Sequence, residues 1–194
     1  MREDAHTRYG TVSQLLHWAT ALLVLVAFSY GLGGSEQRVY LPARDFERQL
    51  HETLGLCVFA LVVLRVLWRV FDHSPEPEPS ARWMALAART TKVGLYLLLF
   101  AVPLTAIAGA WLEGHALTLL GGVAIAPLLA RSHDLGVRIS EIHTWLGDTI
   151  MWLAGLHAGA ALYHHFVLRD RVLVAMLPRR IGVWRAQHDL GRTR

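Results

Sequence analysis

The sequence has 194 residues, of which 54% are apolar and 18% are charged, and its mean hydropathy is +0.35. This composition excludes an ordinary soluble domain, in which about a quarter of the residues are charged. The net charge is +4, but the arginines cluster beside the apolar segments, which favours a membrane protein over a nucleic-acid-binding one. The single cysteine, Cys57, excludes a disulfide framework.

Four apolar segments each have about the length needed to cross the roughly 30 Å hydrocarbon core of a membrane. They are residues 12–33, 50–71, 93–112 and 140–168. The proline-containing run at 72–80 cannot continue a helix, whereas Pro103 is tolerated within a membrane helix and is expected to kink it. We therefore expect one all-α membrane domain over residues 1–194, a bundle of four transmembrane helices with a basic tail at 169–194.

Residues 116–130 are also apolar, but they are few for a membrane span and include Gly121, Gly122 and Pro127. This length favours an interfacial or capping segment. With four spans, most of the 19 lysines and arginines lie on the side of the membrane that holds both chain termini. The positive-inside rule then places both termini in the cytoplasm. A fifth helix at 116–130 would move the arginine-rich tail to the outer side of the membrane, against this rule.

Two histidines, His143 and His157, lie fourteen residues apart in the last apolar segment. At about 100° and 1.5 Å per residue, they project from nearly one face and are about 21 Å apart along the helix. The topology places His17 at the depth of His157 and His51 at the depth of His143. A polar group at membrane depth needs a partner. Two facing imidazole pairs therefore predict two bis-histidine haems, with the four histidines as iron ligands.

A small residue follows each of these histidines after four positions, where a flat macrocycle needs room beside its ligand. The four small residues are Ala21, Gly55, Gly147 and Ala161. Small residues serve close helix packing in membranes equally well, so a bundle without haem, whose histidines only form hydrogen bonds, is the alternative. A zinc site is excluded, because four histidines at two depths cannot close one tetrahedral shell.

Other polar residues lie near these two depths. Arg65 is expected to contact the propionates of the inner haem, and Arg138 those of the outer haem; a role in topology alone is the alternative for both. His164 and His165 lie about two turns beyond His157, near the cytoplasmic interface. Their candidate partners are a haem propionate, a quinone or a lipid headgroup.

Several short motifs carry a resemblance to a known family. They are Leu16-His17-Trp18, Ile142-His143-Thr144, Gly155-Leu156-His157-Ala158 and Leu177-Pro178-Arg179-Arg180. With these motifs the sequence resembles the bacterial cytochrome b561 family over roughly residues 9–180, and it departs most at 114–140. The resemblance implies two b haems held by His17, His51, His143 and His157 in the bacterial inner membrane.

The resemblance also implies transmembrane electron transfer, and the best-understood member of the family passes electrons from superoxide to ubiquinone. Superoxide oxidation with ubiquinone as acceptor is therefore the expected activity. The alternative is an electron-carrier subunit that serves a separate redox enzyme or redox partner. A bis-histidine iron has both axial positions filled, which favours electron transfer over oxygen chemistry. The outer-side arginines are expected to attract the superoxide anion; they are Arg38, Arg44, Arg48, Arg131 and Arg138.

Overall fold

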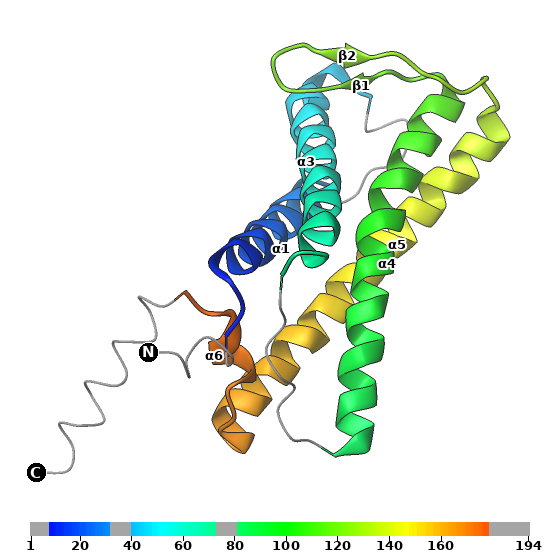
Figure 1. The fold of residues 1–194 in the computed structure, drawn as a ribbon. Coiled ribbons are helices and arrows are strands. Elements are labelled where there is room, and N and C mark those ends of the chain that lie inside the picture. Colours follow the sequence, from blue (N-terminus) through cyan, green and yellow to red (C-terminus); the bar gives the residue numbers. More distant parts are fainter. Residues whose placement is uncertain (1–7, 32–39, 73–80, 179–194) are drawn as a thin grey trace, which may run out of the picture.

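The computed structural model describes residues 8–31, 40–72 and 81–178, which are mostly helical (Figure 1). In chain order the elements are α1 (Thr11–Gly31), the 3₁₀ helix η2 (Pro42–Arg44), α3 (Asp45–Arg69), α4 (Arg82–Glu113), β1 (Leu117–Thr118), β2 (Ala124–Ile125), α5 (His133–Tyr163), the π-helix η3 (His164–Leu168) and α6 (Val172–Met176). Arg38, nearly all of the expected linker at 72–80 and most of the basic tail lie outside the described residues.

Three of the long helices begin five or more residues before the apolar segments that predict them. Helix α3 begins at Asp45 rather than near residue 50, α4 at Arg82 rather than near residue 93, and α5 at His133 rather than near residue 140. Hydropathy marks only the part of a helix that suits hydrocarbon. The residues that precede 93 include alanine, leucine, methionine and arginine, which favour helix in any solvent, so the helix continues beyond the apolar part.

Three segments are long and apolar enough to cross a membrane: α1, the stretch Pro42–Arg69 that includes α3, and α4. Helix α5 has 31 residues, about 46 Å at 1.5 Å per residue, so its length also suffices. Its apolar character is lower because Asp148 and the two histidines interrupt it. By length and composition, the described part of the chain thus has three candidate spans, with α5 as a further long helix.

The long helices pack as two pairs. Helix α1 packs against α3, and α4 packs against α5, while α3 also contacts α4 and so joins the pairs (Figure 1). Helix α1 begins beside α6 at one end of the molecule, which we call the terminal end. The hairpin of β1 and β2 lies at the opposite end, which we call the hairpin end.

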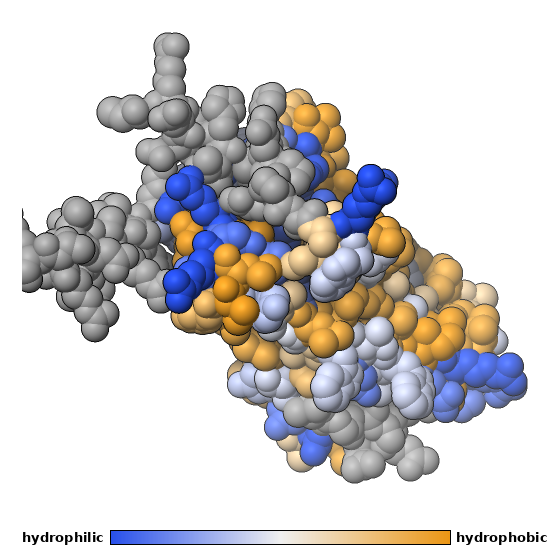
Figure 2. Space-filling model, turned by 90° about the horizontal axis from the view of Figure 1, so that it is seen from below, coloured by the Kyte–Doolittle hydropathy of each residue, from blue (hydrophilic) through white to orange (hydrophobic). Residues whose placement is uncertain are grey.

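The buried core lies midway between the two ends of the bundle. It consists of Val58 and Val62 of α3, Leu99 of α4 and Ile150 of α5. Many large apolar side chains outside this core are exposed, and the face drawn in Figure 2 shows apolar patches among the polar residues. An apolar exterior of this kind suits contact with hydrocarbon.

Residues 116–130 contain a short hairpin and no helix. Leu117 pairs with Ile125 and Thr118 with Ala124, in antiparallel register. Gly121 and Gly122 form the turn with φ of 88° and 81°, values that side chains disfavour. The segment therefore covers an end of the bundle, as its length and its glycines predict.

A close crossing of α4 and α5 fixes α5 at the hairpin end. A Cβ atom on Gly136 would lie 2.5 Å from Cγ of Glu113, and one on Gly109 would lie 2.6 Å from Oγ of Ser140. The Ser140 hydroxyl donates a hydrogen bond of 2.7 Å to the Glu113 carboxylate across the same crossing. Only glycine permits this approach, which sets the position of α5 one turn before His143.

Candidate functional site

The four histidines singled out in the sequence meet in two pairs. The rings of His51 on α3 and His143 on α5 have centroids 6.1 Å apart and planes inclined at 81°. The rings of His17 on α1 and His157 on α5 have centroids 6.4 Å apart and planes inclined at 77°. The first pair lies toward the hairpin end and the second toward the terminal end, so α5 contributes one imidazole to each.

The spacing within each pair fits a metal ion between the rings. An imidazole centroid lies about 1.1 Å from its ring nitrogens, and a metal–nitrogen bond measures about 2.0 Å, so two opposed ligands have centroids roughly 6 Å apart. Among the described residues, no group of three or more histidine, cysteine, aspartate or glutamate side chains is arranged to hold a metal ion. Two opposed imidazoles therefore need further ligands from another molecule, and the four nitrogens of a haem macrocycle meet that need.

Backbone carbonyls orient the two histidines of the hairpin-end pair. Nδ1 of His51 donates to the Ala27 carbonyl at 2.7 Å, and Nδ1 of His143 donates to the Val102 carbonyl at 2.9 Å. A carbonyl oxygen can only accept, so the hydrogen is on Nδ1 and the lone pair of Nε2 remains for a metal. Each carbonyl belongs to the helix that packs against the histidine's own helix, α1 for α3 and α4 for α5.

The terminal-end pair is positioned by the start of α1 and by α6. Trp18 lies against His17, with ring centroids 5.3 Å apart, and its indole Nε1 donates to the Met176 carbonyl at 2.9 Å. One turn earlier, the buried Gln14 side chain donates to the Ala175 carbonyl at 3.1 Å. Nδ1 of His17 is buried without a hydrogen-bond partner among the described residues. Helix α6 therefore fixes the part of α1 that carries His17.

The two arginines expected beside the haems differ in their surroundings. Arg65 lies close enough to His17 and His157 for its charge to act on both, and its guanidinium carbon is 5.4 Å from the centroid of the Tyr96 ring. Arg138 is exposed on α5 and does not line the cavity beside the hairpin-end pair. Arg65 thus lies near the terminal-end pair, whereas Arg138 does not line the cavity beside the hairpin-end pair.

A cavity of about 530 Å³ surrounds the hairpin-end pair, and His51 and His143 both line it. Gly55 and Gly147 line the same cavity, and a Cβ atom on either glycine would meet no atom within 4 Å. The space beside each histidine is therefore open on the face one turn along its helix. A flat, apolar macrocycle fits between two helices lined in this way.

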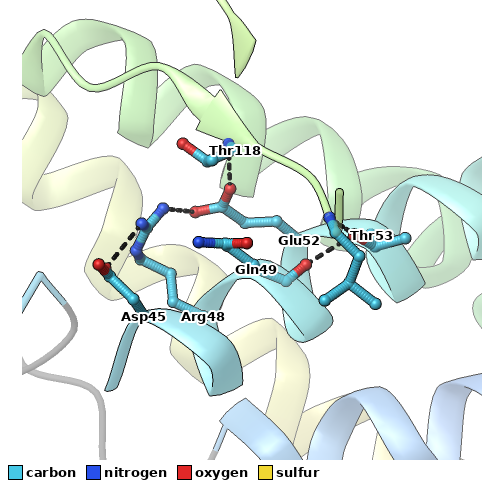
Figure 3. Close-up of polar contacts among 7 residues, drawn as sticks. Asp45, Arg48, Gln49, Glu52, Thr53 and Thr118 are labelled. Carbon is cyan, nitrogen blue, oxygen red and sulfur yellow. Dashed lines mark hydrogen bonds and ion pairs between the residues drawn. The ribbon is translucent and has the colours of Figure 1, made fainter. Parts of the chain in front are cut away.

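Two arginines that line this cavity, Arg44 and Arg48, lie ahead of His51 on the chain. Arg48 bonds to Glu52 through Nη1 and to Asp45 through Nη2, both at 3.0 Å (Figure 3). Its guanidinium also lies 5.3 Å from the centroid of the Tyr40 ring. Residues three and four apart share a helix face, so the spacing of Arg48 and His51 in the sequence is a signal that both side chains lie beside the same cavity.

The two residues that follow His51 hold the hairpin to α3. The free carboxylate oxygen of Glu52 accepts the Thr118 amide at 2.5 Å, and the Thr53 hydroxyl accepts the Leu120 amide at 2.9 Å (Figure 3). We call these two contacts the hairpin latch. Leu117 and Leu119, beside the latched amides, line the cavity. The latch therefore fixes one wall of the hairpin-end site.

These features define a helical membrane protein whose opposed imidazoles fit haem iron. A sequence model of the prokaryotic cytochrome b561 family matches residues 8–179. The chain belongs to the prokaryotic cytochrome b561 family, as its motifs indicate; proteins of this family bind b haem and transfer electrons. The candidate spans and the family together fit a bacterial membrane protein.

Several relatives match along nearly their whole length. Cytochrome b561 homolog 2 of Escherichia coli (strain K12) is 33% identical over 171 residues, which cover 88% of this chain and 91% of the relative. Probable superoxide oxidase CybB of Yersinia pestis is 32% identical over 181 residues, 91% of this chain and 99% of the relative. Cytochrome b562 of Cereibacter sphaeroides is 32% identical over 175 residues, 87% of this chain and 94% of the relative.

We predict that replacing Gly147 by leucine reduces the haem content of the purified protein, because the added side chain enters the cavity beside His143. The pyridine haemochrome absorbance, divided by protein concentration, measures this content and is expected to fall by about one haem per chain. Gly159→Leu is the matched control on the same helix, because a Cβ atom there meets no atom within 4 Å and Gly159 does not line the cavity. Full haem content in the Gly147 variant would contradict this use of the cavity.

We predict that Thr53→Val loosens the hairpin, because valine keeps the shape of threonine but cannot accept the Leu120 amide. Hydrogen exchange of the segment around Leu120 is expected to become about tenfold faster, which corresponds to about 1.4 kcal/mol. Thr105→Val is the control, since the Thr105 hydroxyl bonds only to carbonyls of its own helix. Unchanged exchange would mean that other contacts hold the hairpin.

Proposed function

We propose that this protein is a di-haem cytochrome of the bacterial inner membrane that oxidises superoxide and passes the electrons to ubiquinone. The observation that supports it most is the opposition of two imidazole pairs at two depths of one bundle, with centroid distances of 6.1 and 6.4 Å. Helix α5, which contributes to both pairs, is then the fourth membrane-spanning helix.

In this proposal His51 and His143 hold one b haem, and His17 and His157 hold the other. The haems, when bound, supply one-electron carriers at the two depths. Two histidines on each iron would leave it no position at which oxygen could bind, and the group would then supply electron transfer alone. The Ala27 and Val102 carbonyls keep Nε2 of His51 and His143 directed at the iron. Arg65 is proposed to hold a propionate at the terminal end.

The core between the two pairs supports their separate roles. Ile150 lies seven residues from each α5 ligand, so the two sites are about 21 Å apart along the helix axis. Val58, Val62 and Leu99 pack around Ile150. This apolar layer keeps water out of the middle of the bundle, so that electrons and not ions cross it.

The proposed reaction couples a one-electron donor to a two-electron acceptor. Two superoxide anions each lose one electron and become dioxygen, while ubiquinone gains the two electrons and two protons and becomes ubiquinol. By the positive-inside rule the hairpin end faces the periplasm, where Arg44 and Arg48 line the cavity beside His51. Arg44 pairs with Glu47, and Arg48 pairs with Asp45 and Glu52, so carboxylates offset part of the positive charge that would attract a superoxide anion. The name of the Yersinia pestis relative supports the same donor.

Rapid mixing tests this function directly. We predict that a superoxide source reduces the haems of the oxidised, purified protein, that superoxide dismutase abolishes this reduction, and that added ubiquinone reoxidises the haems. The absorbance of the haems measures both steps. Haems that dithionite reduces but superoxide leaves oxidised would contradict the proposal and favour the alternative, an electron-carrier subunit for a separate redox partner.

A further inference from the structure

The end of α5 is built unlike an ordinary helix terminus. After Tyr163 the chain changes to the π-helix His164–Leu168, and the next residue, Arg169, has a φ of 56°. Such a left-handed conformation is uncommon outside glycine, and short π-helical turns occur frequently at functional sites. The local sequence therefore adopts a costly backbone at one particular position, directly beyond the terminal-end pair.

This backbone brings His164 onto Asp170. Nδ1 of His164 donates to Oδ2 of Asp170, and the other carboxylate oxygen accepts the Val172 amide at 3.1 Å. The Asp170 amide in turn donates to the His164 carbonyl at 3.2 Å. Asp170 is thus fixed from both sides, and both side chains of the pair are only 20% exposed.

The bond to Asp170 determines which nitrogen of His164 can exchange a proton. Because a carboxylate accepts, Nδ1 carries a hydrogen and Nε2 is left to take up and release a proton. A carboxylate held on Nδ1 also keeps the ring in one orientation, which is the arrangement used by histidines that act as general acids and bases. His164 is therefore chemically equipped for proton transfer.

The position of His164 places it beside the terminal-end pair. It follows His157 by seven residues, nearly two full helical turns, so it lies on nearly the same face of α5 and about 10 Å further along the axis. Helix α6, which packs against both α5 and η3, also holds the start of α1 through Gln14 and Trp18. His164 therefore lies at the end of the bundle where α1, α5 and α6 converge.

We propose that His164, oriented by Asp170, donates protons to the carbonyl oxygens of ubiquinone at the terminal end. This inference rests on the proposed function, in which electrons arrive at that end one at a time. As the quinone receives an electron pair, the Nε2–H bond of His164 breaks and an O–H bond forms on the quinone. Water at the membrane surface returns a proton to Nε2, and a second transfer completes ubiquinol. Two electrons and two protons are thereby consumed for each quinone.

The test measures the oxidative half of the reaction alone. Purified holoprotein is reduced with dithionite, mixed with a short-chain ubiquinone, and followed by haem absorbance in H₂O and D₂O. In His164→Gln the reoxidation rate at saturating quinone is expected to fall about tenfold or more and to show a larger solvent isotope effect, with unchanged haem content. Asp170→Asn is expected to slow the same step. Thr149→Val is the control on the same helix, because the exposed Thr149 hydroxyl donates only to the Trp145 carbonyl one turn away, and it should behave as wild type.

The outcomes separate this inference from the proposed function. Reoxidation of His164→Gln at the wild-type rate would overturn the inference, and so would loss of haem from both the His164 and Asp170 variants, which would indicate a structural role. A wild-type protein that superoxide does not reduce would overturn only the proposed donor. A reduced wild-type protein that ubiquinone does not reoxidise would overturn both.

Discussion

The rest of this structure depends on one constraint: a polar imidazole within an apolar bundle is costly unless it has a partner. His51 and His143 meet the constraint with a backbone carbonyl on each Nδ1, and their ring centroids are 6.1 Å apart, a spacing that a metal ion between them would fit. Since α5 supplies one imidazole to each pair, its helical repeat sets the distance between the two pairs. The position of α5 is therefore the feature on which both sites depend.

The neighbouring elements each fix one part of that arrangement. The glycines at the crossing of α4 and α5 bring Ser140 onto Glu113 and so set α5 just before His143. At the hairpin end, Glu52 and Thr53 hold the hairpin beside the cavity. At the terminal end, α6 holds the start of α1 near His17. Rigid support of this kind is what an electron carrier needs, because its ligands must keep their positions in both oxidation states.

Helical periodicity in the sequence was sufficient to predict which histidines would meet, because spacing along α5 and the direction of each helix determine depth. The three-residue spacing of Arg48 and His51 also carried a signal for their shared helix face, but the sequence analysis placed Arg48 only among the outer-side arginines. Arg138 is five residues from His143, about 140° around the helix, so the same rule already disfavours a shared site. The helix starts at Asp45, Arg82 and His133 were missed, because hydropathy marks the residues that suit hydrocarbon and does not mark the polar turns that extend a helix beyond it.

Other contacts were beyond the reach of sequence patterns. The bond between Glu52 and the Thr118 amide joins residues 66 positions apart, through a hairpin whose register no local pattern specifies. The bond between His164 and Asp170 requires a π-helical turn and a left-handed Arg169, which run against the local preference for an α-helix. Sequence periodicity describes regular elements well, whereas such contacts arise where the backbone leaves the regular pattern.

The central claim is that each histidine pair holds one haem iron from both sides. The most direct measurement is to count b haem per chain in the purified protein and then to expose the reduced protein to carbon monoxide. The account predicts two haems per chain and an absorption spectrum that carbon monoxide leaves unchanged, because every axial position is filled. A single haem per chain, or a haem that binds carbon monoxide, would contradict it.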